Sequence, residues 1–415
     1  NNPENDASVQ PATVTTAQGG TAWIHADGSF EYLAKADFTG EDSFEYQVTD
    51  PFHTETGRVV VTVLPSRYWY VKPFPAGPPP ATADGRDQFP FASFTDVQAK
   101  AAPGDSIFVL KNGTEQLVGV ASLENGQALI GQGITTSIVR RVAVGSGPAD
   151  SITVTVLAGT GQAPGLTRTD AGPTITLAQD NLIRGVGIDA DNGAAIAGST
   201  FGTLTVSDVT VDPTGPALDL SNGTLAAVFT TLSSTSSGGV GLSLQNVSGT
   251  LTALAGSISG PTGVGFSVNG GSATITYPGS ITTSSSHSVS IEGITGGAIT
   301  LSGSITDTGA GIKVRTNTGG TVTFSGASTS LSTVANNAVY LDSNTGASVV
   351  FSGGGLAITT TTGNGFTATS GGTVTVTGAD NTVTSTGTGT PVTLNGVITG
   401  AGGVVFRSVS ATGTG

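Results

Sequence analysis

The side chains with the clearest potential for chemistry are carboxylates in one stretch of the chain. The candidates are Asp180, Asp189, Asp191, Asp208 and Asp212, with Arg184 nearby. Paired carboxylates serve glycosidases as acid and base, and they serve lyases as calcium ligands. Asp189 and Asp191 would point to the same side if this stretch is a strand. We favour a plainer interpretation, in which these residues lie at corners and on an outer face and keep a Thr-rich surface hydrated.

Metal-binding patterns are sparse in this sequence. His25, His53 and His287 are not at metal-ligand spacing and the chain has no Cys, so we expect surface or turn roles for them. Calcium is more plausible at the start of the chain. There Glu4, Asn5 and Asp6 could help to ligate Ca²⁺ at a module junction, with further ligands from an upstream module. We expect no other cofactor.

Two further motifs invite functional interpretations that the sequence does not sustain. Lys313 and Arg315, in Gly311–Arg315, resemble a basic substrate-binding run of pectin-degrading β-helices, but the companion acidic and His motifs are absent. Thr-x-Thr pairs such as Thr321/Thr323 suggest an ice-binding ladder, which Ala298/Thr300 interrupts. Thr is simply a favoured outward residue of strands. We expect Asn246, Asn269, Asn317 and Asn344 to stack as hydrogen-bonded ladders at corners.

Composition limits the functional class. The 415 residues carry a formal net charge of −14, which disfavours nucleic acid as a partner. No apolar run is long enough for a membrane-spanning helix. The chain has no Cys, so we expect no disulfide framework and no thiolate metal site. It has no initiator Met and no signal peptide, so we expect a mature piece or a segment of something longer.

The positioning elements are repeats that begin near Gly239. Short apolar blocks recur every roughly 23–27 residues, which is within the range of solenoid repeats. Examples are Val240–Leu244, Val264–Val268, Ile312–Val314 and Val339–Leu341. Each repeat holds about three short alternating runs, and stacking them predicts a parallel β-helix. Gly and Asn would supply the positive φ angles of tight corners. A single coil cannot bury enough apolar surface to be stable alone, so neighbouring coils must support one another.

Residues 1–65 have a different pattern, which predicts an antiparallel β module. The expected strands are Ala12–Thr16, Thr21–His25, Ser29–Leu33, Ser43–Val48 and Gly57–Leu64. Phe30, Tyr32, Phe44, Tyr46, Val48, Val59, Val61 and Val63 are expected to point inward. The runs Asp27–Tyr32 and Phe38–Asp50 resemble the tandem immunoglobulin-like or cadherin-like modules of large bacterial surface proteins, although Pro51 stands where that family usually has Gly. The resemblance implies further copies upstream and a spacer role.

Residues 66–120 are predicted to join this module to the coils. Pro73–Pro80 reads as a stiff connector. Phe94, Val97 and Ala101 share one face of a short helix that Pro103 would end, and we expect this helix to plug the first coil. Residues 134–168 fit the period poorly and could form a longer excursion. The runs Trp69–Val71, Pro90-Phe91 and Pro103–Asp105 resemble the entry segment of secreted right-handed β-helix proteins, a group that contains adhesins and polysaccharide-active enzymes.

These observations predict an all-β chain. It would hold a small immunoglobulin-like β-sandwich at 1–65, a Pro-rich linker and cap at 66–120, and a right-handed parallel β-helix at 121–415. We expect an extracellular structural or adhesive segment of a large bacterial surface protein, and not an enzyme. The alternative is a polysaccharide-active β-helix lyase, hydrolase or epimerase. Residues 402–411 resemble a recurrent segment of long bacterial β-helix surface proteins, which implies that the natural chain continues. Expected partners are neighbouring modules of the longer chain, a glycan or surface protein, and a second copy bound at the uncapped last coil.

Overall fold

A computed structural model describes residues 7–35, 38–63, 67–74, 82–142 and 150–413 of the chain. It contains two compact units, Asn1–Arg67 and Tyr68–Gly415. Almost every described element is a strand, and α1 (Phe94–Gln98) is the single α-helix in the described ranges. The division between the units falls at Arg67, near the predicted end of the first module at residue 65.

The N-terminal unit is built from two three-stranded antiparallel sheets. The first sheet contains β1 (Ser8–Val9), β5 (Gly40–Thr49) and β6 (Thr54–Val63). The second contains β2 (Ala12–Thr15), β3 (Thr21–Ile24) and β4 (Phe30–Leu33). Ala22, Ile24 and Phe44 form the buried core of the unit, and Tyr32, Tyr46, Val59 and Val61 pack against it. The alternation read from the sequence therefore located these strands to within a few residues.

Phe30 departs from the prediction that it points into this core. Its side chain is 41% exposed, and its ring contacts Phe44 edge-on with centroids 5.2 Å apart. The physical reason is position, because β4 is an edge strand, paired with β3 alone. A large apolar residue at the rim of so small a sheet has too few neighbours to cover it.

The second unit begins with strands that already pair in parallel. β7 (Tyr68–Val71) aligns with β8 (Ser106–Val109) so that Trp69 faces Ile107. β8 in turn aligns with β11 (Ala128–Gly131), and β9 (Gln116–Val118) with β14 (Gly165–Thr167). The parallel ladders thus start within residues 66–120, the range that the sequence assigns to a linker and cap.

A small cap covers the first turn, as predicted. Ser93 caps α1, its Oγ accepting a hydrogen bond from the N–H of Asp96 at 3.3 Å, and Phe94 and Val97 are buried. The Trp69 and Phe91 rings stack with centroids 6.0 Å apart. The indole N–H of Trp69 donates to Oδ2 of Asp105 over 2.8 Å. Together these side chains close over apolar surface that an open coil end would expose.

An antiparallel hairpin interrupts the early coils. β12 (Thr136–Val142) pairs with β13 (Asp150–Leu157), inside the segment predicted as an excursion from the period. The Tyr70 hydroxyl donates to the carbonyl oxygen of Val156 over 2.6 Å and fixes the hairpin base to the first turn. The other strands of this region are β10 (Ala121–Ser122), β15 (Ile175–Thr176), β16 (Leu182–Arg184) and β17 (Gly187–Ile188).

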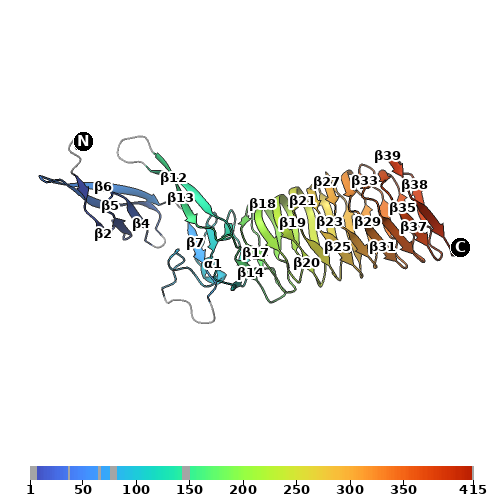
Figure 1. Ribbon diagram of the computed structural model, residues 1–415, viewed down its shortest axis with the longest axis horizontal. Coiled ribbons are helices and arrows are strands. Elements are labelled where there is room, and N and C mark those ends of the chain that lie inside the picture. The colour runs from blue at the N-terminus through green and yellow to red at the C-terminus, as the bar shows by residue number, and fades with distance from the viewer. Residues whose placement is uncertain (1–6, 36–37, 64–66, 75–81, 143–149, 414–415) are drawn as a thin grey trace. The chain divides into compact units, whose positions relative to one another are not determined.

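From β18 (Ile196–Val211) onward the coils are regular, and Figure 1 shows them side by side from green to red. In the first of these coils one long strand, such as β21 (Leu242–Ala253), spans two faces, and the later coils contribute three separate strands each. The strands pair in parallel with their counterparts in the next coil. For example, β23 (Phe266–Gly271), β24 (Thr274–Tyr277) and β25 (Ser280–Thr283) pair with β26 (His287–Glu292), β27 (Thr295–Leu301) and β28 (Ile305–Asp307). The predicted parallel β-helix with three strands per coil is confirmed. We call this stack of coils the rod.

The remaining strands follow the same scheme. Before β23 come β18 (Ile196–Val211), β19 (Leu218–Leu232), β20 (Ser234–Thr235), β21 (Leu242–Ala253) and β22 (Ser257–Ser259). After β28 come β29 (Gly311–Arg315), β30 (Gly319–Phe324), β31 (Thr329–Thr333), β32 (Val339–Asp342), β33 (Ser348–Phe351) and β34 (Leu356–Thr360). The last are β35 (Phe366–Thr369), β36 (Thr373–Val376), β37 (Thr382–Ser385), β38 (Val392–Asn395), β39 (Ile398–Val404) and β40 (Ser408–Ala411).

One corner of the rod repeats a left-handed backbone conformation in eight successive coils. The residues that occupy it, with φ between 50° and 73°, are Asn222, Asn246, Gly270, Gly293, Thr316, Ser343, Ser370 and Gly396. Gly and Asn adopt this conformation readily, as predicted, whereas Thr316 does so at a steric cost. The corner turns the chain between two sheets and holds the outward residues on either side in columns.

Candidate functional site

The acidic candidates at residues 180–212 separate into different roles. Oδ1 of Asp180 accepts a hydrogen bond from the N–H of Thr203 over 2.8 Å, and Asp180 has a positive φ, so it shapes a corner. Asp208 forms an exposed ion pair with Arg184, with Oδ2 and Nη2 3.4 Å apart. Asp189 and Asp191 do share the outer side, since Ala190 between them is buried. The structure therefore brings only part of the group together.

Asp189 is the carboxylate in this group with the most unusual environment. Partial burial raises the pKa of Asp189, and the nearby charges of Asp191 and Asp212 raise it further. The backbone N–H of Ala190 opposes this shift by donating to Oδ1 over 2.8 Å. In the described part of the chain, no set of three His, Cys, Asp or Glu side chains converges as a metal site would require.

The structure describes the surroundings of the three His residues but not those of the predicted calcium ligands. Glu4, Asn5 and Asp6 lie outside the described residues, so their role as calcium ligands stays a prediction. Nε2 of His25 lies 3.7 Å from Oε1 of Glu31. Nδ1 of His53 lies 3.9 Å from Oδ1 of Asp50. His287 is half-buried, and burial lowers its pKa.

The corner Asn residues form two short ladders instead of one. Nδ2 of Asn317 donates to Oδ1 of Asn344 over 2.8 Å, and both side chains are buried. Nδ2 of Asn246 donates to Oδ1 of Asn222 over 3.3 Å at the left-handed corner. Asn269 lies in another column, where it aligns with Glu292. The Asn317–Asn344 pair joins two coils inside the rod, whereas the Asn222–Asn246 contact is exposed.

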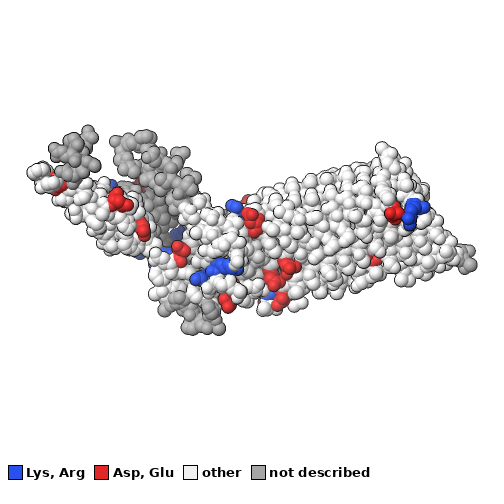
Figure 2. All heavy atoms as spheres, viewed as in Figure 1, with Lys and Arg blue, Asp and Glu red and all other residues white. Residues whose placement is uncertain are grey.

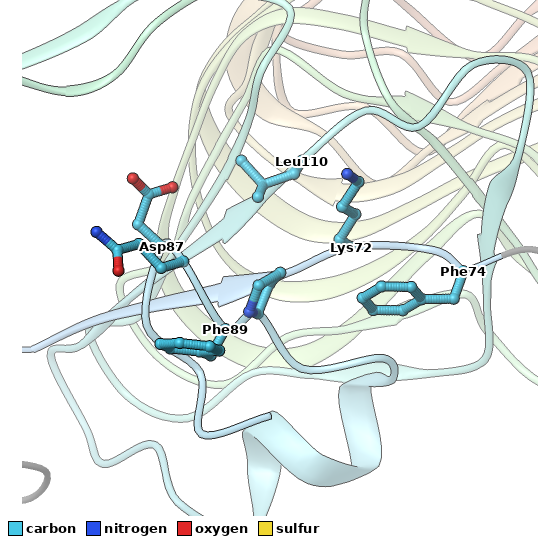
Figure 3. Close-up of a pocket in the computed structure, with 7 residues that line it drawn as sticks. Lys72, Phe74, Asp87, Phe89 and Leu110 are labelled. Atoms are coloured by element: carbon cyan, nitrogen blue, oxygen red, sulfur yellow. The ribbon is translucent and has the colours of Figure 1, made fainter. Parts of the chain in front are cut away.

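A small pocket lies beside β7 and β8, at the start of the second unit (Figure 3). Its volume is about 220 Å³. Figure 3 shows Asp87 and Phe89 on one side and Lys72 and Phe74 on the other, with Leu110 between them. Such a pocket is smaller than most small-molecule sites, which occupy about 300–1,000 Å³.

A second group of polar side chains lies on the outer face of β26, β29, β32 and β35. We call it the charged patch, and it consists of Glu292, Lys313, Arg315, Tyr340, Asp342 and Thr367. The alternate residues Val314 and Leu341 are in the core, so the patch residues point outward. The sequence interpretation singled out Lys313 and Arg315 but did not join them to the others.

Glu292 is the centre of the ionic contacts in the charged patch. Its Oε1 lies 2.6 Å from Nζ of Lys313, and its Oε2 lies 3.4 Å from Nε of Arg315. Burial favours the neutral acid, but hydrogen bonds from Lys313 and Ser290 and the two positive charges outweigh it and lower the pKa of Glu292. The carboxylate is thereby kept ionised.

Asp342 extends the charged patch by one coil. It aligns with Arg315 on one side and with Thr369 on the other, and its Oδ1 accepts a hydrogen bond from Thr369 at 2.9 Å. Burial opposes ionisation, yet the hydroxyls of Thr369, Ser370 and Ser343 and the charge of Arg315 lower the pKa of Asp342. Two cations and two anions therefore alternate along three coils with no net charge.

Charge is rare in this half of the chain. The sequence has no Asp, Glu, Lys or Arg between Asp219 and Glu292, or between Asp342 and Asp380. Figure 2 shows one face, where charged side chains gather over the early coils and most of the later surface is white. Four of the few charged residues after Asp219 lie together in the charged patch, and solubility alone does not explain why they are grouped.

Residues 1–62 match the bacterial Ig domain family. The first unit is therefore an Ig module, as its two small antiparallel sheets suggest, and the parallel β-helix follows it. Searches of curated proteins and of solved structures found no match to this chain. Among the described residues, no helix is long and apolar enough to cross a membrane.

Proposed function

We propose that this chain is an extracellular segment of a bacterial surface protein, in which the Ig module is a spacer and the rod provides reach and contact. The observation that carries the proposal is the combination of a bacterial Ig domain with parallel ladders that continue from coil to coil. Bacterial Ig domains suggest display outside the cell. Ladders that run from coil to coil suit a stiff element, because each coil is stabilised by its neighbours.

The outer faces of the rod support contact rather than catalysis. They consist mainly of Thr, Ser and Asn, which offer many modest hydrogen bonds to a glycan or another protein. Labelling intact cells of the source bacterium with an antibody against this chain tests the proposal. We expect signal on unpermeabilised cells that surface proteolysis removes. Signal that appears only after permeabilisation would refute it.

A polysaccharide-active enzyme remains the second candidate because Asp189 has a raised pKa beside two further carboxylates. The discriminating assay incubates the full chain with acidic polysaccharides. We expect no cleavage. Cleavage by the wild type that the double substitution Asp189→Ala and Asp191→Ala abolishes would replace the proposal of a structural role.

A further inference from the structure

Two polar atoms in the charged patch are buried without a hydrogen-bond partner among the described residues. They are Nε of Arg315 and Oγ1 of Thr367. Nε of Arg315 is within ionic distance of Glu292 but lacks hydrogen-bond geometry. Thr367 points away from the core, yet its side chain is only 7% exposed. Unmade hydrogen bonds of this kind are costly, and because both atoms have almost no accessible surface, a ligand can satisfy them only where the neighbouring side chains shift to admit it.

Tyr340 contributes an aromatic surface at the centre of the charged patch. It aligns with Lys313 in the preceding coil and with Thr367 in the following one, and it is partly exposed. Its hydroxyl makes no hydrogen bond to another described residue. An aromatic ring flanked by a few oriented polar groups is the usual composition of a site that binds an amphipathic molecule.

Charge balance favours a neutral ligand. Lys313 and Arg315 are already compensated by Glu292 and Asp342, so an anion would have to displace a carboxylate from its partners. Adjacent hydroxyls of a sugar can instead donate to a carboxylate and accept from a guanidinium without disturbing the pairs. The less polar face of a pyranose ring can rest on an aromatic ring such as that of Tyr340.

The charged patch is also elongated along the rod. Its residues stand in two columns, Lys313–Tyr340–Thr367 and Glu292–Arg315–Asp342, which the strand pairing aligns from coil to coil. Neighbouring strands are about 4.8 Å apart, and columns two residues apart are separated by about 7 Å. This strip is narrow and long, and its spacing along the axis is close to the size of one sugar ring.

We propose that the charged patch binds a neutral glycan chain, laid along the rod axis with a sugar ring on Tyr340. The inference rests on the proposed function, since it names a ligand for the contact face of the rod. Recognition would come from hydrogen bonds of hydroxyls with Arg315, Asp342 and Thr367.

Titration of the full chain with a panel of oligosaccharides tests the proposal. The probes are the neutral hexasaccharides of cellulose, starch, mannan and galactan, with oligogalacturonate as the acidic comparison, followed by saturation-transfer NMR and calorimetry. We expect at least one neutral probe to bind. Tyr340→Ala and Arg315→Ala should each weaken that binding by about tenfold or more, and Tyr340→Phe should retain most of it.

Arg407→Ala is the matched control, because Nη1 of Arg407 makes an exposed ion pair with Oδ1 of Asp380 at 2.9 Å elsewhere on the rod. It should leave binding unchanged, and circular dichroism should show that every variant is folded. Binding of no neutral probe at millimolar concentration, binding of oligogalacturonate alone, or equal loss in Tyr340→Ala and Arg407→Ala would overturn the inference. Cell-surface labelling would still stand in each of these cases, so the two proposals fail separately.

Discussion

Asn317 and Asn344 are joined side chain to side chain across two coils, with Nδ2 of Asn317 2.8 Å from Oδ1 of Asn344 and both residues buried. The ladder continues at both ends. Nδ2 of Asn344 donates to the carbonyl oxygen of Val314 over 2.9 Å, and Oδ1 of Asn317 accepts from the N–H of Ile294 over 2.8 Å. The corner amides therefore satisfy backbone groups that the turn would leave without partners.

Replacing Asn344 by Leu should lower the free energy of unfolding by about 1–3 kcal/mol. The change removes the acceptor that Nδ2 and the backbone N–H of Asn317 share, and it removes the side-chain donor to the Val314 carbonyl, all in a buried corner. Urea denaturation followed by circular dichroism measures this. Asn395→Leu is the control, since Asn395 is exposed, and it should change stability by about 0.5 kcal/mol or less. Equal effects of the two substitutions would show that the buried amides do not support the coils.

Phe351→Ala should be among the most damaging single changes in the rod. Its ring stacks on Phe324 with centroids 4.6 Å apart and meets Phe366 edge-on at 5.8 Å, so truncation opens a cavity. We expect the free energy of unfolding, measured by urea denaturation, to fall by about 3–5 kcal/mol. Leu254→Ala, at a side chain that is 64% exposed, should cost little by comparison. A small loss for Phe351→Ala would mean that the coils rearrange around the missing ring.

Thr316→Gly should stabilise the rod, although Gly usually weakens a fold. Thr316 holds φ at 55° at the left-handed corner, a conformation that is unfavourable for a β-branched residue and open to Gly. The expected gain in the free energy of unfolding, measured by urea denaturation, is about 1 kcal/mol. Thr375→Gly, in the middle of β36, should instead lose about that amount. A loss at both positions would show that the corner is not strained.

The Ig module should lose stability in acid. Asp42 is buried, which raises its pKa, but its carboxylate accepts hydrogen bonds from Thr16, the Gln18 N–H, Tyr32 and the Ser43 N–H, and the net effect is a lowered pKa. A group whose pKa is lower in the folded state stabilises it above the unfolded pKa, near 4, and this contribution disappears as the pH falls through the folded pKa.

Hydrogen exchange of β3, β4 and β5, corrected for intrinsic rates, should show protection that falls below about pH 4. Asp42→Asn should have weaker protection at pH 7 and a smaller further loss in acid. The variant should still lose some protection in acid, because hydrogen bonds also lower the pKa values of the carboxyls of Asp27 and Asp50. Identical acid profiles for the variant and the wild type would rule out a role for Asp42.

Much of the fold was predictable because alternation and repeat length are properties of the sequence itself. The three strands per coil, the cap at Phe94 and Val97, and the excursion near residues 134–168 all followed from pattern. The pairing of β7 with β8 did not follow from the pattern. Trp69 and Ile107 are partners there, but the connection between them contains α1 and is longer than one repeat. Phe30 is exposed because it lies on an edge strand, and the alternation of apolar and polar residues does not show which strand lies at an edge.

Only part of the candidate site could be predicted from the sequence. Glu292, Arg315 and Asp342 recur at the local repeat length, so aligning the repeats would have placed them in one column. The diagonal contact of Lys313 with Glu292 and the unpaired atoms of Arg315 and Thr367 depend on side-chain packing, which repeat spacing does not encode.

Engineered disulfides test the stacking of coils most directly, since the chain has no native Cys. Thr323 and Val350 are outward partners in adjacent coils, whereas Thr375 lies one coil further along. Oxidation of the Thr323→Cys, Val350→Cys variant should give an intramolecular bond, because neighbouring strands fall within the Cα separation that a disulfide spans. The Thr323→Cys, Thr375→Cys variant should stay reduced. Equal cross-linking of both variants, or of neither, would contradict the parallel stack of coils.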